Sequence, residues 1–170
     1  MNITNKFLVK VLFVSAMIAV GNVAAHATDA KLTVCDYYML LPNDYFNIPL
    51  ASRKNLLDKN AGGIVDEKNG YLYAQGKGSQ PSLEVALFKR KSQEDIVAVC
   101  HNETNECVGF MYFYERRPRY QGVVRCPNLL PTKFNAKYNY KLPRGGKTII
   151  VTDSAGKVVH TYSWNGSKFQ

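Results

Sequence analysis

Short apolar runs separated by turn-forming residues dominate the chain after residue 30, and this pattern predicts strands. Two of these runs flank Asn69-Gly70, a dipeptide typical of tight hairpin turns. The runs are Thr33–Leu41, 64–65, 71–73, Leu83–Lys89, Ile96–Cys100, Val108–Tyr114, Thr148–Thr152 and Lys157–Trp164. Because they follow one another at short intervals without crossover helices, an antiparallel sheet is expected.

One segment has a helical pattern, from about Pro49 to Lys59. Proline suits the first turn of a helix, three leucines can share one buried stripe, and Gly62-Gly63 provides a stop signal. The runs Leu83–Lys89, Ile96–Cys100 and Val108–Tyr114 are apolar on both faces in places, which predicts the centre of the sheet. The expected fold class is therefore α+β: mainly antiparallel β-sheet with one helix packed on it, disulfide-stabilised.

Residues 1–27 have the order of a secretory signal peptide. Lys6 and Lys10 precede an apolar run, Val11–Val20, and the Ala25-x-Ala27 pattern resembles a cleavage site. The run is about half of the roughly 20 residues that a membrane span needs, so a membrane anchor is disfavoured. We therefore predict a signal peptide over 1–27, a single secreted α+β domain over 28–170, and a periplasmic or secreted protein.

Lipidation of Cys35 is a weaker alternative for the same region. The sequence before this cysteine, Leu32-Thr33-Val34, loosely resembles a lipobox, but Asp29 and Lys31 separate it from the apolar run.

The predicted secreted part contains four cysteines: Cys35, Cys100, Cys107 and Cys126. An even number in an exported chain favours two disulfides, and three pairings are open. We favour Cys100–Cys107, across a polar loop between two strands, together with Cys35–Cys126. Zinc sites usually contain close cysteine pairs such as C-x2-C, and none is present, so we expect no metal.

Composition adds a cationic surface to this picture. The 170 residues are 46% hydrophobic, which indicates one folded domain, and the formal charge is +9. Loss of 1–27 would remove two lysines and no acid, leaving +7. The residues that would form a basic and aromatic binding surface are Lys89, Arg90, Lys91, Arg116, Arg117, Arg119, Tyr120 and Arg125. Such a surface attracts anions. Export makes nucleic acid an improbable partner, so a protein or an anionic envelope polymer is expected, without a cofactor or a membrane span.

No catalytic motif accompanies this surface. Residues 28–170 contain two histidines, His101 and His160, and neither G-x-S-x-G nor H-E-x-x-H occurs. Arg144-Gly145-Gly146-Lys147 is rich in glycine, but only Gly146-Lys147-Thr148 matches a P-loop, and a strand rather than a helix is expected to follow. We interpret this segment as a turn and assign no catalytic residue.

Five short phrases are spread over most of the predicted secreted part: Tyr37–Phe46 (YYMLLPNDYF), Leu83–Arg90 (LEVALFKR), Ile96–Val99, Leu142–Ile149 (LPRGGKTI) and Trp164–Phe169 (WNGSKF). Together they resemble a family of uncharacterised exported proteins of Gram-negative bacteria. The resemblance implies export and implies no activity, partner or catalytic residue.

These observations favour a non-enzymatic exported binding module that recognises an anionic macromolecule or acidic protein. An inhibitor or an immunity-type protein is one concrete form of such a module. A hydrolase acting on envelope polymers and a structural subunit of an envelope assembly are the two alternatives.

Overall fold

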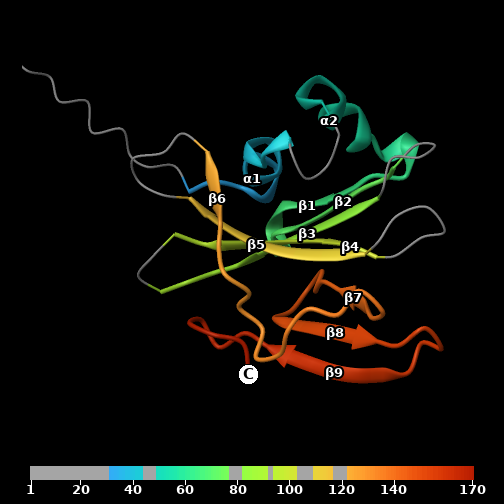
Figure 1. Ribbon diagram of the computed structural model, residues 1–170. Coiled ribbons are helices and arrows are strands. Elements are labelled where there is room, and N and C mark those ends of the chain that lie inside the picture. The colour runs from blue at the N-terminus through green and yellow to red at the C-terminus, as the bar shows by residue number, and fades with distance from the viewer. Residues whose placement is uncertain (1–30, 44–48, 77–81, 92–93, 103–108, 117–121) are drawn as a thin grey trace, which may run out of the picture. The chain divides into compact units, whose positions relative to one another are not determined.

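Six strands pair in sequence order to form an antiparallel sheet (Figure 1). They are β1 (Ile64–Asp66), β2 (Tyr71–Ala74), β3 (Leu83–Phe88), β4 (Ile96–His101), β5 (Phe110–Arg116) and β6 (Val123–Arg125). Every residue of β4 is buried, because both faces of the sheet are covered. The expected central position of three apolar runs is confirmed, since they form β3, β4 and β5.

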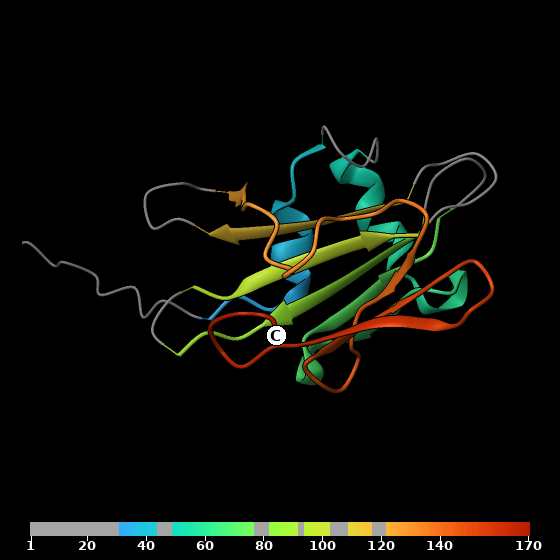
Figure 2. The ribbon, with the colours of Figure 1, turned by 60° about the horizontal axis from the view of Figure 1, so that its bottom comes forward.

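A second antiparallel sheet packs on one face of the first (Figure 2). It contains β7 (Asn139–Lys141), β8 (Thr148–Thr152) and β9 (Val158–Ser163). Phe88 and Phe113 from the six-stranded sheet meet Trp164 and Phe169, which follow β9, in a shared apolar core. The chain beyond residue 126 therefore covers one side of the larger sheet.

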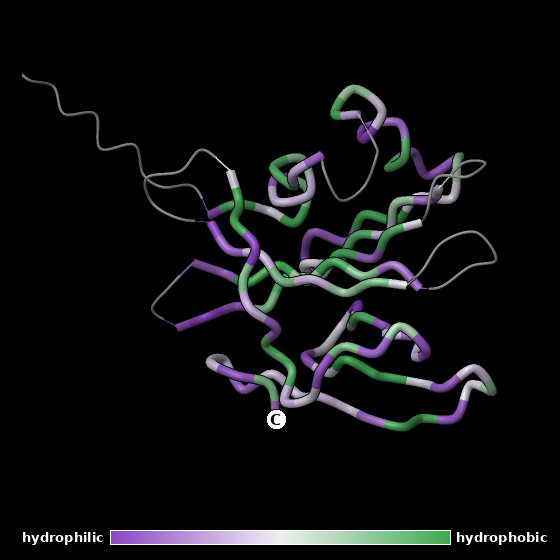
Figure 3. Tube along the Cα trace, in the orientation of Figure 1, coloured by the Kyte–Doolittle hydropathy of each residue, from purple (hydrophilic) through white to green (hydrophobic). Residues whose placement is uncertain are grey.

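Two short helices cover the other face, α1 (Val34–Leu40) and α2 (Leu50–Leu56). Val34, Tyr37 and Tyr38 of α1 lie in a second apolar core with Leu72 and Val85 of the sheet. Figure 3 shows hydrophobic positions concentrated along the central strands, between the helices and the smaller sheet. Two 3-10 turns, Lys59–Ala61 and Glu67–Asn69, complete the described elements.

The expected α+β fold with one helix on one sheet is wrong, because the described part of the chain forms two sheets and two short helices. The strand expected over Thr33–Leu41 is α1. Thr33 accepts a hydrogen bond from the Asp36 amide, and the Asp36 carboxylate accepts one from the Thr33 amide. This reciprocal capping box begins a helix and outweighs the strand preference of the aromatic residues.

The expectation of a disulfide-stabilised fold finds no support among the described residues, because no disulfide joins any two of Cys35, Cys100 and Cys126. Cys35 packs in the core on the helix side of the larger sheet, whereas Cys126 packs in the core between the sheets. The sheet therefore separates the two cysteines of the favoured pair. The Cys100 thiol donates a hydrogen bond to the Tyr140 carbonyl at 3.1 Å. Cys107 lies outside the described residues.

The computed structural model describes residues 31–43, 49–76, 82–91, 94–102, 109–116 and 122–170. The predicted signal peptide over 1–27 lies outside these ranges. Neither α1 nor α2, nor any other helix within these ranges, has the length and hydropathy needed to cross a membrane.

Candidate functional site

Five of the eight predicted surface residues lie within the described ranges. Lys89, Arg90 and Lys91 follow β3, while Arg116 and Arg125 end β5 and β6. Arg117, Arg119 and Tyr120 lie outside the described residues. The sheet register places Arg116 opposite Val123 and Arg125 opposite Tyr114. Because Val123 and Tyr114 belong to the core on the helix side, both arginines project to that side of the sheet.

The end of the sheet that carries Arg90 also carries acids that pair with its cations. The Arg90 guanidinium lies 2.6 Å from the Glu115 carboxylate, and the Lys31 ammonium lies 3.3 Å from the Asp95 carboxylate. Burial, assisted by Glu94 and Asp95, raises the pKa of the Tyr37 hydroxyl at this end to about 12. Cations and acids therefore pair with one another at this end of the sheet, and Arg90 is held in one of these ion pairs.

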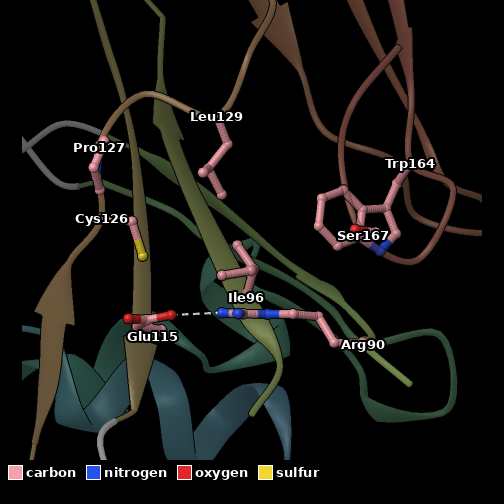
Figure 4. A pocket seen from close by; sticks show the side chains of 8 residues that line it. All are labelled: Arg90, Ile96, Glu115, Cys126, Pro127, Leu129, Trp164 and Ser167. Carbon is pink, nitrogen blue, oxygen red and sulfur yellow. Dashed lines mark hydrogen bonds and ion pairs between the residues drawn. The ribbon is translucent and has the colours of Figure 1, made fainter. Parts of the chain in front are cut away.

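A hollow of about 140 Å³ lies beside this ion pair. Figure 4 shows the Arg90 and Glu115 side chains pointing toward each other, with Cys126 near Glu115 and with Ile96, Leu129 and Trp164 around them. The Trp164 indole donates to the Lys89 carbonyl at 2.9 Å. The acid in this hollow is already bound by an arginine, and both histidines are absent from its lining. The Trp164 hydrogen bond therefore ties the segment after β9 to the end of the larger sheet beside this hollow.

The clearest cationic and aromatic arrangement lies on β5 and β6. The Arg125 guanidinium carbon lies 3.6 Å from the centre of the Tyr112 ring. The Tyr112 ring stacks on Phe110, with ring centres 5.3 Å apart and planes inclined by 17°. Phe110 in turn lies 5.4 Å from the His101 ring. We call Arg125, Tyr112 and Phe110 the arginine–aromatic column.

The strand pattern explains how the column forms. Phe110 and Tyr112 are two residues apart on one strand, so their side chains project to the same face. Arg125 faces the same way from the adjacent edge strand β6. Both rings are half-buried, whereas Arg125 is exposed. Neither Tyr112 nor Phe110 was among the predicted site residues, because their grouping with Arg125 depends on a β5–β6 register that the sequence pattern does not reveal.

If the protein were a hydrolase, His101 or His160 would be the candidate acid or base. His101 is buried, and its Nδ1 lies 2.9 Å from the Ser82 carbonyl, an acceptor that fixes Nδ1 as the protonated nitrogen. His160 stacks against the Tyr162 ring, 5.7 Å away between centres. Within the described ranges, neither histidine hydrogen-bonds a carboxylate, and no group of three or more potential metal ligands occurs.

Comparisons with protein-family models, with curated protein sequences and with solved structures find no match to this chain.

Proposed function

We propose that the protein is an exported, non-enzymatic binding module that recognises an anionic macromolecule through the arginine–aromatic column. The observation that supports this proposal is the position of the Arg125 guanidinium, 3.6 Å above the Tyr112 ring. A guanidinium stacked on an aromatic ring is held in one orientation, and guanidinium groups are well suited to recognising carboxylates and phosphates. Arginine and tyrosine are also the residue types that most often carry binding energy at interfaces.

The location and charge of the column suit an extended anionic partner. Arg125 is exposed on an edge strand, and Arg116 projects to the same side from the end of β5. A formal charge of +7 over 28–170 would speed association with a polyanion and would make binding sensitive to salt. Because we propose export, the partner is an anionic envelope polymer or an acidic protein rather than nucleic acid.

Binding to purified lipopolysaccharide, an anionic envelope polymer, tests the proposal. We compare Arg125→Gln with Lys157→Gln, which removes the same charge from an exposed position between β8 and β9. We expect Arg125→Gln to weaken binding about tenfold, as loss of a central arginine does at interfaces, and Lys157→Gln to weaken it less than about twofold. Equal effects would indicate that net charge alone drives the interaction, and absence of binding by the unsubstituted protein would reject this partner class.

A further inference from the structure

The loop between β7 and β8 forms a second cationic feature, separate from the column. It surrounds a hollow of about 280 Å³ whose lining includes Lys141, Arg144 and Lys147. All three side chains are exposed, and Thr148 and Ile150 of β8 complete one side of the hollow. The sequence pattern predicted a turn here, which the structure bears out, but a turn does not require three cations around a concave surface.

Carboxylates of the larger sheet fix the first half of this loop. Glu84 accepts a hydrogen bond from the Leu142 amide at 2.8 Å. Asp66 accepts one from Arg144 Nε at 3.2 Å. Both acids therefore bind donors of the loop itself, and the contact with Asp66 uses only one of the three guanidinium nitrogens of Arg144. The two terminal nitrogens of Arg144 have no hydrogen-bond partner among the described residues.

The other end of the loop is fixed by the backbone. The Trp164 amide donates to the Lys147 carbonyl at 2.8 Å, which ties the loop to the segment that follows β9. The cations are thus carried on a loop held at both ends, which lowers the entropy lost when a ligand binds.

Two glycines occupy the middle of the loop without a structural need for glycine. A Cβ atom built on Gly145 or Gly146 would have no heavy atom within 4 Å, and neither residue has a positive φ. Neither amide donates a hydrogen bond to a described residue. Glycine at these positions leaves two amide donors open to close approach by a ligand, which is how glycine-rich segments accommodate oxyanions.

We infer that this hollow is a binding site for a phosphate group. Two lysine ammonium groups, the terminal nitrogens of Arg144 and two glycine amides supply donors from several directions, and a phosphate presents several acceptor oxygens. A carboxylate has only two oxygens and would leave most of these donors unused. The site differs from a P-loop, because strand β8 follows it and no helix contributes its amino terminus. The inference rests on the proposed recognition of anions for its ligand class, although it uses none of the column residues.

Titration of the full secreted protein with pyrophosphate, followed by ¹H–¹⁵N NMR, tests the site. We expect saturable shifts of the Gly145 and Gly146 amides. Lys141→Gln/Lys147→Gln should weaken pyrophosphate binding about tenfold, whereas Lys133→Gln/Lys157→Gln, which removes the same charge elsewhere on the exposed surface, should weaken it less than about twofold. Unmoved glycine amides, or equal weakening by the two double variants, would overturn the inference.

A glycine variant separates binding from folding. Gly145→Ala/Gly146→Ala keeps every charge, and its two methyl groups enter open space, so the melting temperature should not change. We expect weaker pyrophosphate binding because the methyl groups block approach to the amides. Unchanged affinity would overturn the role given to the glycines and with it the site.

Further measurements separate this inference from the proposed function and identify the source of the phosphate. Arg125→Gln should weaken lipopolysaccharide binding and leave the pyrophosphate titration unchanged. If Arg125→Gln leaves lipopolysaccharide binding unchanged while the glycine amides still respond to pyrophosphate, the proposed function is rejected and the phosphate site is kept. If Arg125→Gln weakens lipopolysaccharide binding but the glycine amides of the unsubstituted protein do not respond to pyrophosphate, the phosphate site is rejected and the proposed function is kept. In parallel, Lys141→Gln/Lys147→Gln is tested on phosphatidylglycerol vesicles and on soluble polyphosphate. Selective loss of vesicle binding assigns the phosphate to a lipid headgroup, and selective loss of polyphosphate binding assigns it to a soluble polymer. If the double variant keeps both vesicle binding and polyphosphate binding, the proposed site is overturned.

Discussion

The Arg53 guanidinium donates a hydrogen bond of 2.6 Å to the backbone carbonyl of Leu41, the C-cap residue directly after α1. The same nitrogen donates to the Tyr38 carbonyl at 2.9 Å. Arg53 itself belongs to α2 and is only 1% exposed. The last carbonyls of a helix have no partner within the helix and carry partial negative charge. One buried arginine therefore closes α1 and attaches α2 to it.

Replacement of Arg53 by methionine should destabilise the protein by about 3 kcal/mol, because the carbonyls of Tyr38 and Leu41 would lose their donor in a buried position. Lys54→Met is the control, since Lys54 lies in the same helix and is exposed, and it should change the stability by less than about 0.5 kcal/mol. Urea unfolding measures both. Similar losses for the two variants would contradict the role given to Arg53.

Trp164 reports on packing between the two sheets. Its ring centre lies 4.9 Å from that of Phe169 and 6.0 Å from that of Phe88, and the chain contains a single tryptophan. We predict blue-shifted native fluorescence that moves to the red on unfolding. Trp164→Ala should cost about 3–5 kcal/mol of stability, whereas Val158→Ala, at a position 53% exposed, should cost less than about 1 kcal/mol. Native emission resembling that of solvent-exposed indole would be inconsistent with this packing.

Glu84 should make stability depend on pH. Burial raises the pKa of its carboxyl above the ordinary value of 4.5, against the opposing effect of the Leu142 amide. Folding thus favours the protonated form, and this contribution is fully present below pH 4.5 and is lost as the pH rises through the raised pKa. Relative to Glu84→Gln, the unsubstituted protein should therefore lose stability from pH 4 to pH 8 in urea unfolding. A difference that is constant or grows with pH would have the wrong sign.

The thiols of Cys35 and Cys100 should react slowly. Burial raises the pKa of Cys35 to about 11, assisted by Glu67, and burial raises the pKa of Cys100 well above its ordinary value. At pH 8 only about 0.1% of Cys35 would be thiolate, so iodoacetamide should alkylate it far more slowly than a free small-molecule thiol. Peptide mass spectrometry should find Cys100 alkylated only after unfolding. Rapid modification of either residue, or a peptide that joins Cys35 to Cys126, would contradict the structure.

Local apolar pattern and turn chemistry were sufficient to predict most strands. The run Leu83–Lys89 contains β3, which ends one residue earlier, at Phe88. The predicted strand Thr148–Thr152 has the same first and last residues as β8. The hairpin at Asn69-Gly70 is confirmed, because Ile64 pairs with Tyr73 across it and Gly70 has a positive φ. These features depend on residues close in sequence.

Features that depend on distant residues were not predicted. The six-stranded sheet ends at β6 and a separate sheet begins with β7, and no local pattern marks this change of partner. The placement of Cys35 and Cys126 is a further example, since nothing local shows that they pack in the cores on opposite faces of the larger sheet. In the candidate site, the position of Arg125 over Tyr112 requires the β5–β6 register. The pairing of Arg90 with Glu115 likewise joins a residue that follows β3 to a residue of β5.

A double-mutant cycle between Arg125 and Tyr112, measured on lipopolysaccharide binding, tests the proposed function most directly. Arg125→Gln removes the guanidinium, Tyr112→Leu removes the ring beneath it, and the double variant removes both. Because the ring orients the guanidinium, we predict that the second substitution adds little to the first, with a coupling energy of about 1 kcal/mol. Additive effects no larger than that of Lys157→Gln would show that binding does not use the arginine–aromatic column.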